Sequence, residues 1–228
     1  MKNLKVIFGA LSMLTLGSAN AGTLVLDSFN YNPSLSLEVA SNGSAVDSAS
    51  VISVETGATA DYTLTYLNGT GGDAVDGNVF GAGFLSYNED SLANGSLSVK
   101  YSIDAPSPFN TLDFTGYSAF YFDIVAIDGS GGFDIELTLT DAANLTVSAT
   151  YTVDTAGQFL AEFDLMMASP DYAFFDFSSV TSAAANITSD GTGDDFTMSE
   201  IGLVPEPSAL AILGLGLIGL GLRRRRLV

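Results

Sequence analysis

The sequence predicts an all-β fold, a single antiparallel β-sandwich of jelly-roll type. Two patterns predict it. Apolar and polar residues alternate with period two over several short runs, as in strands that have one buried and one solvated face. Glycine-rich turns such as residues 68–72 and 128–132 separate these runs, and short strands between such turns are typical of a sandwich. We expect the domain to span residues 22–203, between an N-terminal signal-peptide helix and a short C-terminal apolar helix.

The individual strands follow from the alternation, in chain order. It is clearest at residues 133–140, where every odd position is apolar. The other alternating runs cover residues 62–66, 97–103, 145–153 and 159–165. Residues 118–127 are apolar on both sides for much of their length, which predicts a central strand.

The N-terminus predicts export. Residues 1–21 combine a basic start, an apolar core and the sequence Ala19-Asn20-Ala21, which is typical of a secretory signal peptide cleaved after Ala21. We therefore expect the Sec export machinery and signal peptidase as partners, and Gly22 as the mature N-terminus.

The charge of the exported part is strongly negative. All 26 acidic residues lie between Asp27 and Glu206, and Lys100 is the only basic residue in that range. The exported part therefore carries a formal charge of −25. This charge excludes a surface that neutralises phosphates, so we expect no nucleic-acid partner.

Several kinds of catalytic site are excluded by composition. The chain has no histidine and no cysteine, so it cannot form a Ser-His-Asp triad, a thiol nucleophile or a metal site of these ligands. A carboxylate-based glycan hydrolase stays open, because it needs two suitably spaced carboxylates. No pattern selects such a pair, and we therefore expect no catalytic residues and no enzyme.

The C-terminal tail, residues 204–228, has three parts in order. Pro205-Glu206-Pro207 comes first, residues 208–222 form an uncharged apolar run of 15 residues, and Arg223, Arg224, Arg225 and Arg226 follow. As a helix the run would span about 22 Å, which is short for a bilayer core of about 30 Å. The arginines are expected to stay on the cytoplasmic side. An ordinary single-pass anchor is the alternative interpretation of this tail.

These three parts closely resemble the PEP-CTERM sorting signal of Gram-negative bacteria. The resemblance implies that an exosortase, a membrane transpeptidase-like enzyme, recognises Pro205, Glu206 and Pro207 and removes the tail. It also implies an inner-membrane intermediate, a final place at the cell surface or in the extracellular matrix, and an association with extracellular polysaccharide.

The body resembles jelly-roll carbohydrate-binding modules with a galactose-binding-like fold. The segments that carry the resemblance are residues 112–117, 133–153, 175–180 and 195–201. It implies that the last strand pairs near the first, residues 23–27. It also implies a structural calcium ion near those two strands, which would draw on Asp27 and Glu200.

Carboxylates on glycine-rich turns are a second argument for calcium, because this ion prefers oxygen ligands. Further candidate ligands are Asp190, Asp194 and Asp195, together with the segments 73–78 and 88–90. Plain surface charge is the alternative.

Sugar binding needs aromatic side chains that are exposed. The chain has no tryptophan and nine tyrosines. Tyr62, Tyr66, Tyr101 and Tyr151 lie on apolar faces of strands and are expected in the core. Tyr31, Tyr87, Tyr117 and Tyr172 are expected in loops, which makes them the candidate ligand residues.

Two functional hypotheses follow. The first is an exported, non-enzymatic surface or matrix protein, with a structural or adhesive role in a biofilm-type polysaccharide layer. The alternative is a carbohydrate-binding module with a defined glycan ligand.

Overall fold

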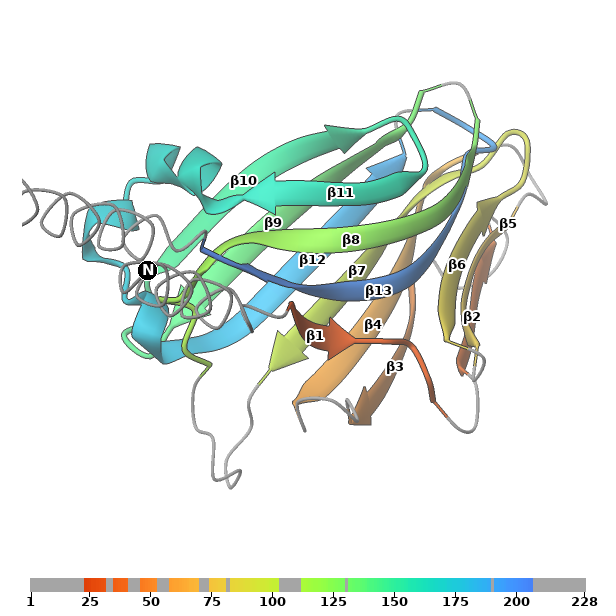
Figure 1. The fold of residues 1–228 in the computed structure, drawn as a ribbon. Helices are drawn as coiled ribbons and strands as arrows, with labels where there is room; N and C mark the ends of the chain where they lie inside the picture. The colour runs from red at the N-terminus through yellow and green to blue at the C-terminus, as the bar shows by residue number, and fades with distance from the viewer. Residues whose placement is uncertain are drawn as a thin grey trace, which may run out of the picture.

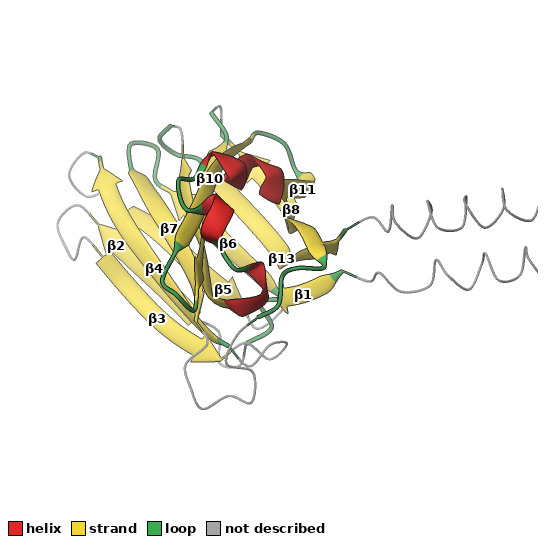
Figure 2. Ribbon diagram, turned by 90° about the vertical axis from the view of Figure 1, so that its left-hand side faces the viewer, coloured by secondary structure: helices red, strands yellow, loops and turns green. Residues whose placement is uncertain are grey.

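The computed structural model describes residues 23–31, 35–40, 46–52, 58–69, 74–80, 83–102, 112–129, 131–189 and 191–206. These residues form two antiparallel sheets packed face to face (Figures 1 and 2). The predicted β-sandwich is confirmed. The expected signal peptide of residues 1–21 lies outside the described residues. The apolar run 208–222 also lies outside them.

The first sheet has seven strands. Its order is β11-β8-β13-β6-β5-β2, and β1 pairs with β13. The strands are β1 (Leu24–Asp27), β2 (Leu35–Ala40), β5 (Ala74–Phe80), β6 (Phe84–Glu89), β8 (Tyr117–Asp128), β11 (Gly157–Glu162) and β13 (Asp195–Pro205).

The second sheet has six strands, in the order β10-β9-β12-β7-β4-β3. They are β3 (Val46–Ile52), β4 (Thr59–Asn68), β7 (Asn94–Ser102), β9 (Phe133–Asp141), β10 (Thr146–Val153) and β12 (Val180–Ser189). Three 3₁₀ helices, η1 (Phe163–Ala168), η2 (Tyr172–Phe174) and η3 (Phe177–Ser179), join β11 to β12. They lie at one end of the sandwich (Figure 1).

The predicted alternation is visible in the burial of the strands. In β9 the odd positions from Phe133 to Asp141 are buried, while the even ones are exposed or half-buried. The predicted central strand is β8, which lies between β11 and β13, and four successive side chains from Ala119 to Phe122 are buried in it. The expected pairing of the last strand with the first is also present, because Leu24 lies opposite Leu203.

One strand, β11, ends earlier than its alternating pattern predicts. Alternation predicts a strand over residues 159–165, but β11 ends at Glu162 and η1 follows. Phe163 and Met166 are buried, whereas Leu165 is 56 % exposed. A spacing of three residues matches the period of a 3₁₀ helix, so the burial of Phe163 and Met166 favours this turn over a longer strand.

Candidate functional site

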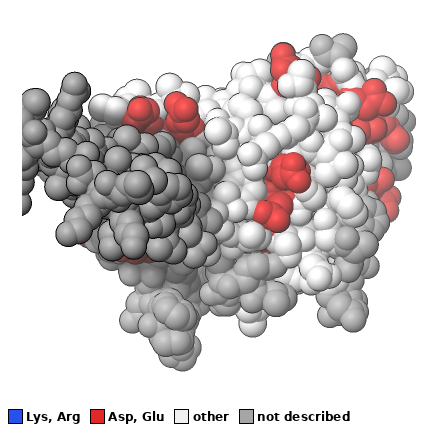
Figure 3. All heavy atoms as spheres, viewed as in Figure 1, with Lys and Arg blue, Asp and Glu red and all other residues white. Residues whose placement is uncertain are grey.

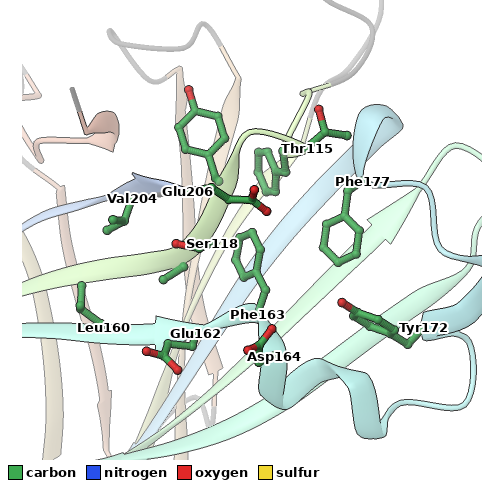
Figure 4. Close-up of a pocket in the computed structure, with 13 residues that line it drawn as sticks. Thr115, Ser118, Leu160, Glu162, Phe163, Asp164, Tyr172, Phe177, Val204 and Glu206 are labelled. Carbon is green, nitrogen blue, oxygen red and sulfur yellow. The ribbon is translucent and has the colours of Figure 1, made fainter. Parts of the chain in front are cut away.

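A groove of about 550 Å³ lies at the end of the first sheet where β13 stops (Figure 4). It is lined by Phe114, Thr115, Tyr117, Ser118, Ala119, Leu160, Glu162, Phe163, Asp164, Tyr172, Phe177, Val204 and Glu206.

The sheet register brings the sides of the groove together. Ala119 of β8 lies opposite Glu162 of β11 on one side and opposite Val204 of β13 on the other. The segment before β8 is tied to the end of the η helices, because the Phe114 amide donates to the Phe177 carbonyl oxygen at 2.7 Å. Residues far apart in the sequence thus meet at one end of the sheet.

Stacked rings form the floor of the groove. Phe163 stacks on Phe114 and on Phe177, with ring centroids 6.3 and 5.7 Å apart. Tyr172 packs edge-on against Phe177, with centroids 5.8 Å apart. Phe114 and Phe163 are buried, whereas Tyr117, Tyr172 and Phe177 are half-buried. The half-buried rings offer apolar surface to a ligand in the groove.

The polar groups of the groove are hydrogen-bond acceptors and hydroxyls. The exposed carboxylates of Glu162, Asp164 and Glu206 line the groove (Figure 4). The Thr115 hydroxyl donates to Asp113 at 2.6 Å. Among the described residues that line the groove there is no lysine or arginine. Aromatic surface beside carboxylates suits a ligand that has an apolar face and many hydroxyl donors, and it does not suit an anion.

Acidic side chains are spread over the outer face as well (Figure 3). Lys100 is the only lysine or arginine within the described residues. This part of the chain therefore has one basic side chain that could pair with an anionic partner.

Two of the four candidate ligand tyrosines lie in the groove. Tyr117 begins β8 and Tyr172 begins η2. The expected exposure of the other two is wrong: Tyr31 is 5 % exposed and Tyr87 is 1 % exposed. Tyr31 donates to buried Asp27, and Tyr87 on β6 stacks on Phe196 at 5.4 Å. Both rings belong to the core.

The expected role of Asp27 in binding calcium must also be corrected. Asp27 is fully buried, and its Oδ2 accepts the hydroxyls of Tyr31, Tyr62 and Tyr101 at 2.6–2.9 Å. Its Oδ1 accepts the Phe29 amide at 2.7 Å. Hydrogen-bond donors therefore occupy both carboxylate oxygens of Asp27. Because Tyr62 and Tyr101 lie in the other sheet, this carboxylate connects the two sheets.

The other calcium candidates are not grouped in the part of the chain that the structure describes. Among those residues, no three aspartates or glutamates lie close enough to hold a metal ion. Glu200 on β13 accepts a hydrogen bond from Tyr121, and Asp195 accepts the Glu89 amide at 2.9 Å. The Asp194 Oδ2 is buried without a hydrogen-bond partner. Asp190 lies outside the described residues, so a calcium site on this turn stays a prediction.

The sorting motif begins inside the sheet. β13 runs through Pro205, which lies opposite Tyr117, and the Glu206 amide donates to the Gly116 carbonyl oxygen at 2.9 Å. The strand thus continues two residues beyond the expected end of the domain. Pro207, Arg223 to Arg226, and the expected cleavage residues Ala19 and Ala21 lie outside the described residues.

Sequence reasoning missed most of the groove. Phe163 and Phe177 form its floor, and Glu162 and Asp164 form its rim. Residues 162–164 fall in the run 159–165 that alternation assigns to a strand, and Phe177 lies in η3. The available signal was the cluster of aromatic residues at 172–177, which has no strand alternation.

No helix within the described residues has the length and apolar composition needed to cross a membrane.

Comparison with known proteins gives distant structural likenesses. A family 11 carbohydrate-binding module of a cellulosomal cellulase of Clostridium thermocellum is 12 % identical, with a TM-score of 0.41 over 82 % of this chain and 96 % of that one. The module TmCBM61, solved with β-1,4-galactotriose, is 10 % identical, with a TM-score of 0.31 over 82 % and 100 %. The agarase AgWH50C is 15 % identical, with a TM-score of 0.40 over 63 % and 24 %. None is close enough to transfer a ligand or an activity to this chain.

The sequence itself has one informative match. No curated protein matches the chain. Residues 203–226 match the family model of the PEP-CTERM protein-sorting motif, in agreement with the order of Pro-Glu-Pro, apolar run and arginines. The chain therefore carries a PEP-CTERM protein-sorting motif at its C-terminal end, which indicates an exported protein that an exosortase sorts through a membrane-anchored intermediate.

Proposed function

We propose that the sorted protein is a non-enzymatic component of the cell surface or extracellular matrix that adheres to extracellular polysaccharide. The observation that carries this proposal is the groove at the end of β13, with its half-buried rings of Tyr117, Tyr172 and Phe177. Sugar rings have apolar faces that pack on aromatic rings, and their hydroxyls donate to carboxylates such as Glu162 and Asp164.

The route to the surface is part of the same proposal. A Gram-negative cell exports the chain through the Sec machinery, and signal peptidase cleaves it after Ala21. Exosortase then acts at Pro205-Glu206-Pro207 in the inner membrane, with the arginines on the cytoplasmic side. Support comes from the sorting motif at residues 203–226 and from the signal-like residues 1–21.

The second candidate is a carbohydrate-binding module with one defined glycan, and the same groove supports it. The two candidates differ in selectivity, because a matrix adhesin tolerates many related chains. A glycan array separates them. A discrete hit supports the defined ligand, whereas diffuse retention on the polysaccharide of the producing cell supports the matrix role.

The test of the groove is affinity electrophoresis of the released protein through gels that contain the polysaccharide. Replacing Tyr172 with Ala should weaken retention about fivefold, because one stacking aromatic ring contributes on the order of 1 kcal/mol. The matched control is Phe84→Ala on β6, where the ring is 38 % exposed and lies outside the groove. Equal retention of both variants would refute the groove as the binding site.

An enzymatic role has its own distinct result. Glu162, Asp164 and Glu206 are the carboxylates that line this groove. Release of reducing sugar that survives EDTA and is lost in Glu162→Gln would contradict the non-enzymatic proposal.

A further inference from the structure

Large apolar side chains gather on the surface at one end of the sandwich. Leu165 and Met167 of η1 are 56 and 60 % exposed, and Phe174 of η2 is 79 % exposed. Phe174 is the most exposed large apolar side chain within the described residues. We call these three residues the apolar ridge. Exposed apolar clusters commonly mark an interaction surface.

The ridge lies at the end of the sandwich where the chain leaves for the tail. Glu162 at the end of β11 pairs with Ala119 of β8, and Ala119 pairs with Val204 of β13. The chain turns into η1 directly after Glu162, and β13 ends one residue after Val204. η1 and the exit of the tail are thus separated by the width of two strand pairings, which is about 10 Å.

The start of β1 lies at this same end. Leu24 pairs with Leu203 in antiparallel register. Leu24 is itself 38 % exposed, and Leu160 of β11 is 45 % exposed.

Chain length then fixes how near this end must be to the membrane. Only Pro207 separates Glu206 from Ser208, where the apolar run begins. The two Cα–Cα steps from Glu206 to Ser208 span at most about 7 Å. The polar layer on each side of a bilayer core is about 5–7 Å thick. The run of 15 residues is also shorter than the core when helical. Glu206 would therefore be drawn into the head-group layer.

We propose that, while the tail is in place, the apolar ridge inserts into the head-group layer of the bilayer that holds the tail. This contact holds the domain in a fixed orientation beside the sorting enzyme. Asp164 and Asp171 next to the ridge remain in the aqueous part of that layer. They disfavour anionic lipid, so the contact depends on apolar burial and not on charge. The inference does not depend on glycan binding.

The absence of cysteine makes the test direct. The tail-bearing protein is placed in nanodiscs of zwitterionic phosphatidylcholine, one copy per disc, with a single spin-labelled cysteine in place of Met167, Phe174 or Leu92. Leu92 is the matched control. It is 53 % exposed and lies beside the start of β13, at the opposite end from Pro205. The measurement is the ratio of oxygen to nickel-chelate accessibility at each label.

The expected result is a ratio several times higher at Met167 and Phe174 than at Leu92. It should fall to the Leu92 value once the tail is cut off and the domain is released. Nickel accessibility at all three labels equal to that of the released domain would overturn the proposal. Shielding of Met167 and Phe174 that persists in the released domain would also overturn it, since a second copy and not lipid would then cover the ridge.

Discussion

The carboxylate of Asp27 is fully buried, so the fold should be sensitive to its replacement. It accepts four hydrogen bonds, from the Phe29 amide and from Tyr31, Tyr62 and Tyr101. β1 belongs to the first sheet, whereas Tyr62 and Tyr101 belong to β4 and β7 of the second. One side chain therefore connects the two sheets in the interior.

We expect Asp27→Ala to destabilise the protein by about 4 kcal/mol. Each buried donor that loses its acceptor costs about 1–3 kcal/mol. Four donors lose an acceptor here, and the sum is lowered because no carboxylate has to be desolvated, which saves several kcal/mol. Asp27→Asn keeps the volume of the side chain but has one acceptor oxygen where the carboxylate has two. Either the N–H₂ or this oxygen then lies opposite the Phe29 amide, and in both orientations some donors lose their acceptor. We therefore expect a cost of about 2 kcal/mol.

The assay is urea unfolding followed by circular dichroism, because the chain has no tryptophan. Leu92→Ala at an exposed turn is the control and should change the free energy of unfolding by less than about 0.5 kcal/mol. A loss below about 1 kcal/mol in Asp27→Ala would refute the argument, because water or the phenols themselves would then satisfy the donors.

The same residue gives a pH dependence with a defined sign. Burial raises the pKa of Asp27, and hydrogen bonds from Tyr62, Tyr31, the Phe29 amide and Tyr101 oppose this rise. The folded state then holds the proton more tightly than the unfolded state, whose pKa is about 3.9. The contribution of Asp27 to stability is complete below that value and is lost as the pH rises through the folded-state pKa. The difference in unfolding free energy between wild type and Asp27→Asn should therefore decrease from pH 4 upward. An increase would mean that the hydrogen bonds outweigh burial.

Three further predictions concern other parts of the chain. Gly202→Ala should cost about 2 kcal/mol in urea unfolding, because a Cβ there would lie 2.5 Å from the Leu24 carbonyl oxygen; unchanged stability would contradict this close approach. Glu89→Gln should cost about 1–3 kcal/mol, because the amide cannot accept both the Gly95 amide and the Asp194 amide, which now bind separate carboxylate oxygens; a stability equal to wild type would show that the cluster tolerates a neutral group. Replacing the motif at residues 205–207 with alanines should leave the intact mass of the exported chain with its tail, and in the membrane fraction, whereas the wild type loses the tail; loss of the tail from both would refute recognition at the motif.

The strand pattern was predictable because each alternating run reports its own burial. β9 and β10 follow directly from alternation between Phe133 and Val153. The central position of β8 follows from apolar residues on both of its faces. The switch from strand to 3₁₀ helix at Phe163 was not predictable in this way, because positions 163 and 165 continue the alternation of β11 by coincidence.

The groove could be predicted only in part for a related reason. Tyr117 and Tyr172 were candidates because each lies outside an alternating run. Tyr31 and Tyr87 satisfied similar criteria, yet their hydroxyls bind the buried carboxylates Asp27 and Glu89. No local pattern reveals an acceptor in the core, since Glu89 and Asp27 are acidic residues of a kind that usually lies on the surface.

The position of the groove beside the end of β13 has a mechanical consequence. If the released protein is held by its C-terminus while polysaccharide fills the groove, tension enters at Glu206 and leaves through the start of β8. The first contacts on that path are the Glu206 to Gly116 hydrogen bond and the pairing of Pro205 with Tyr117. A sheared matrix would therefore strain the attachment point first.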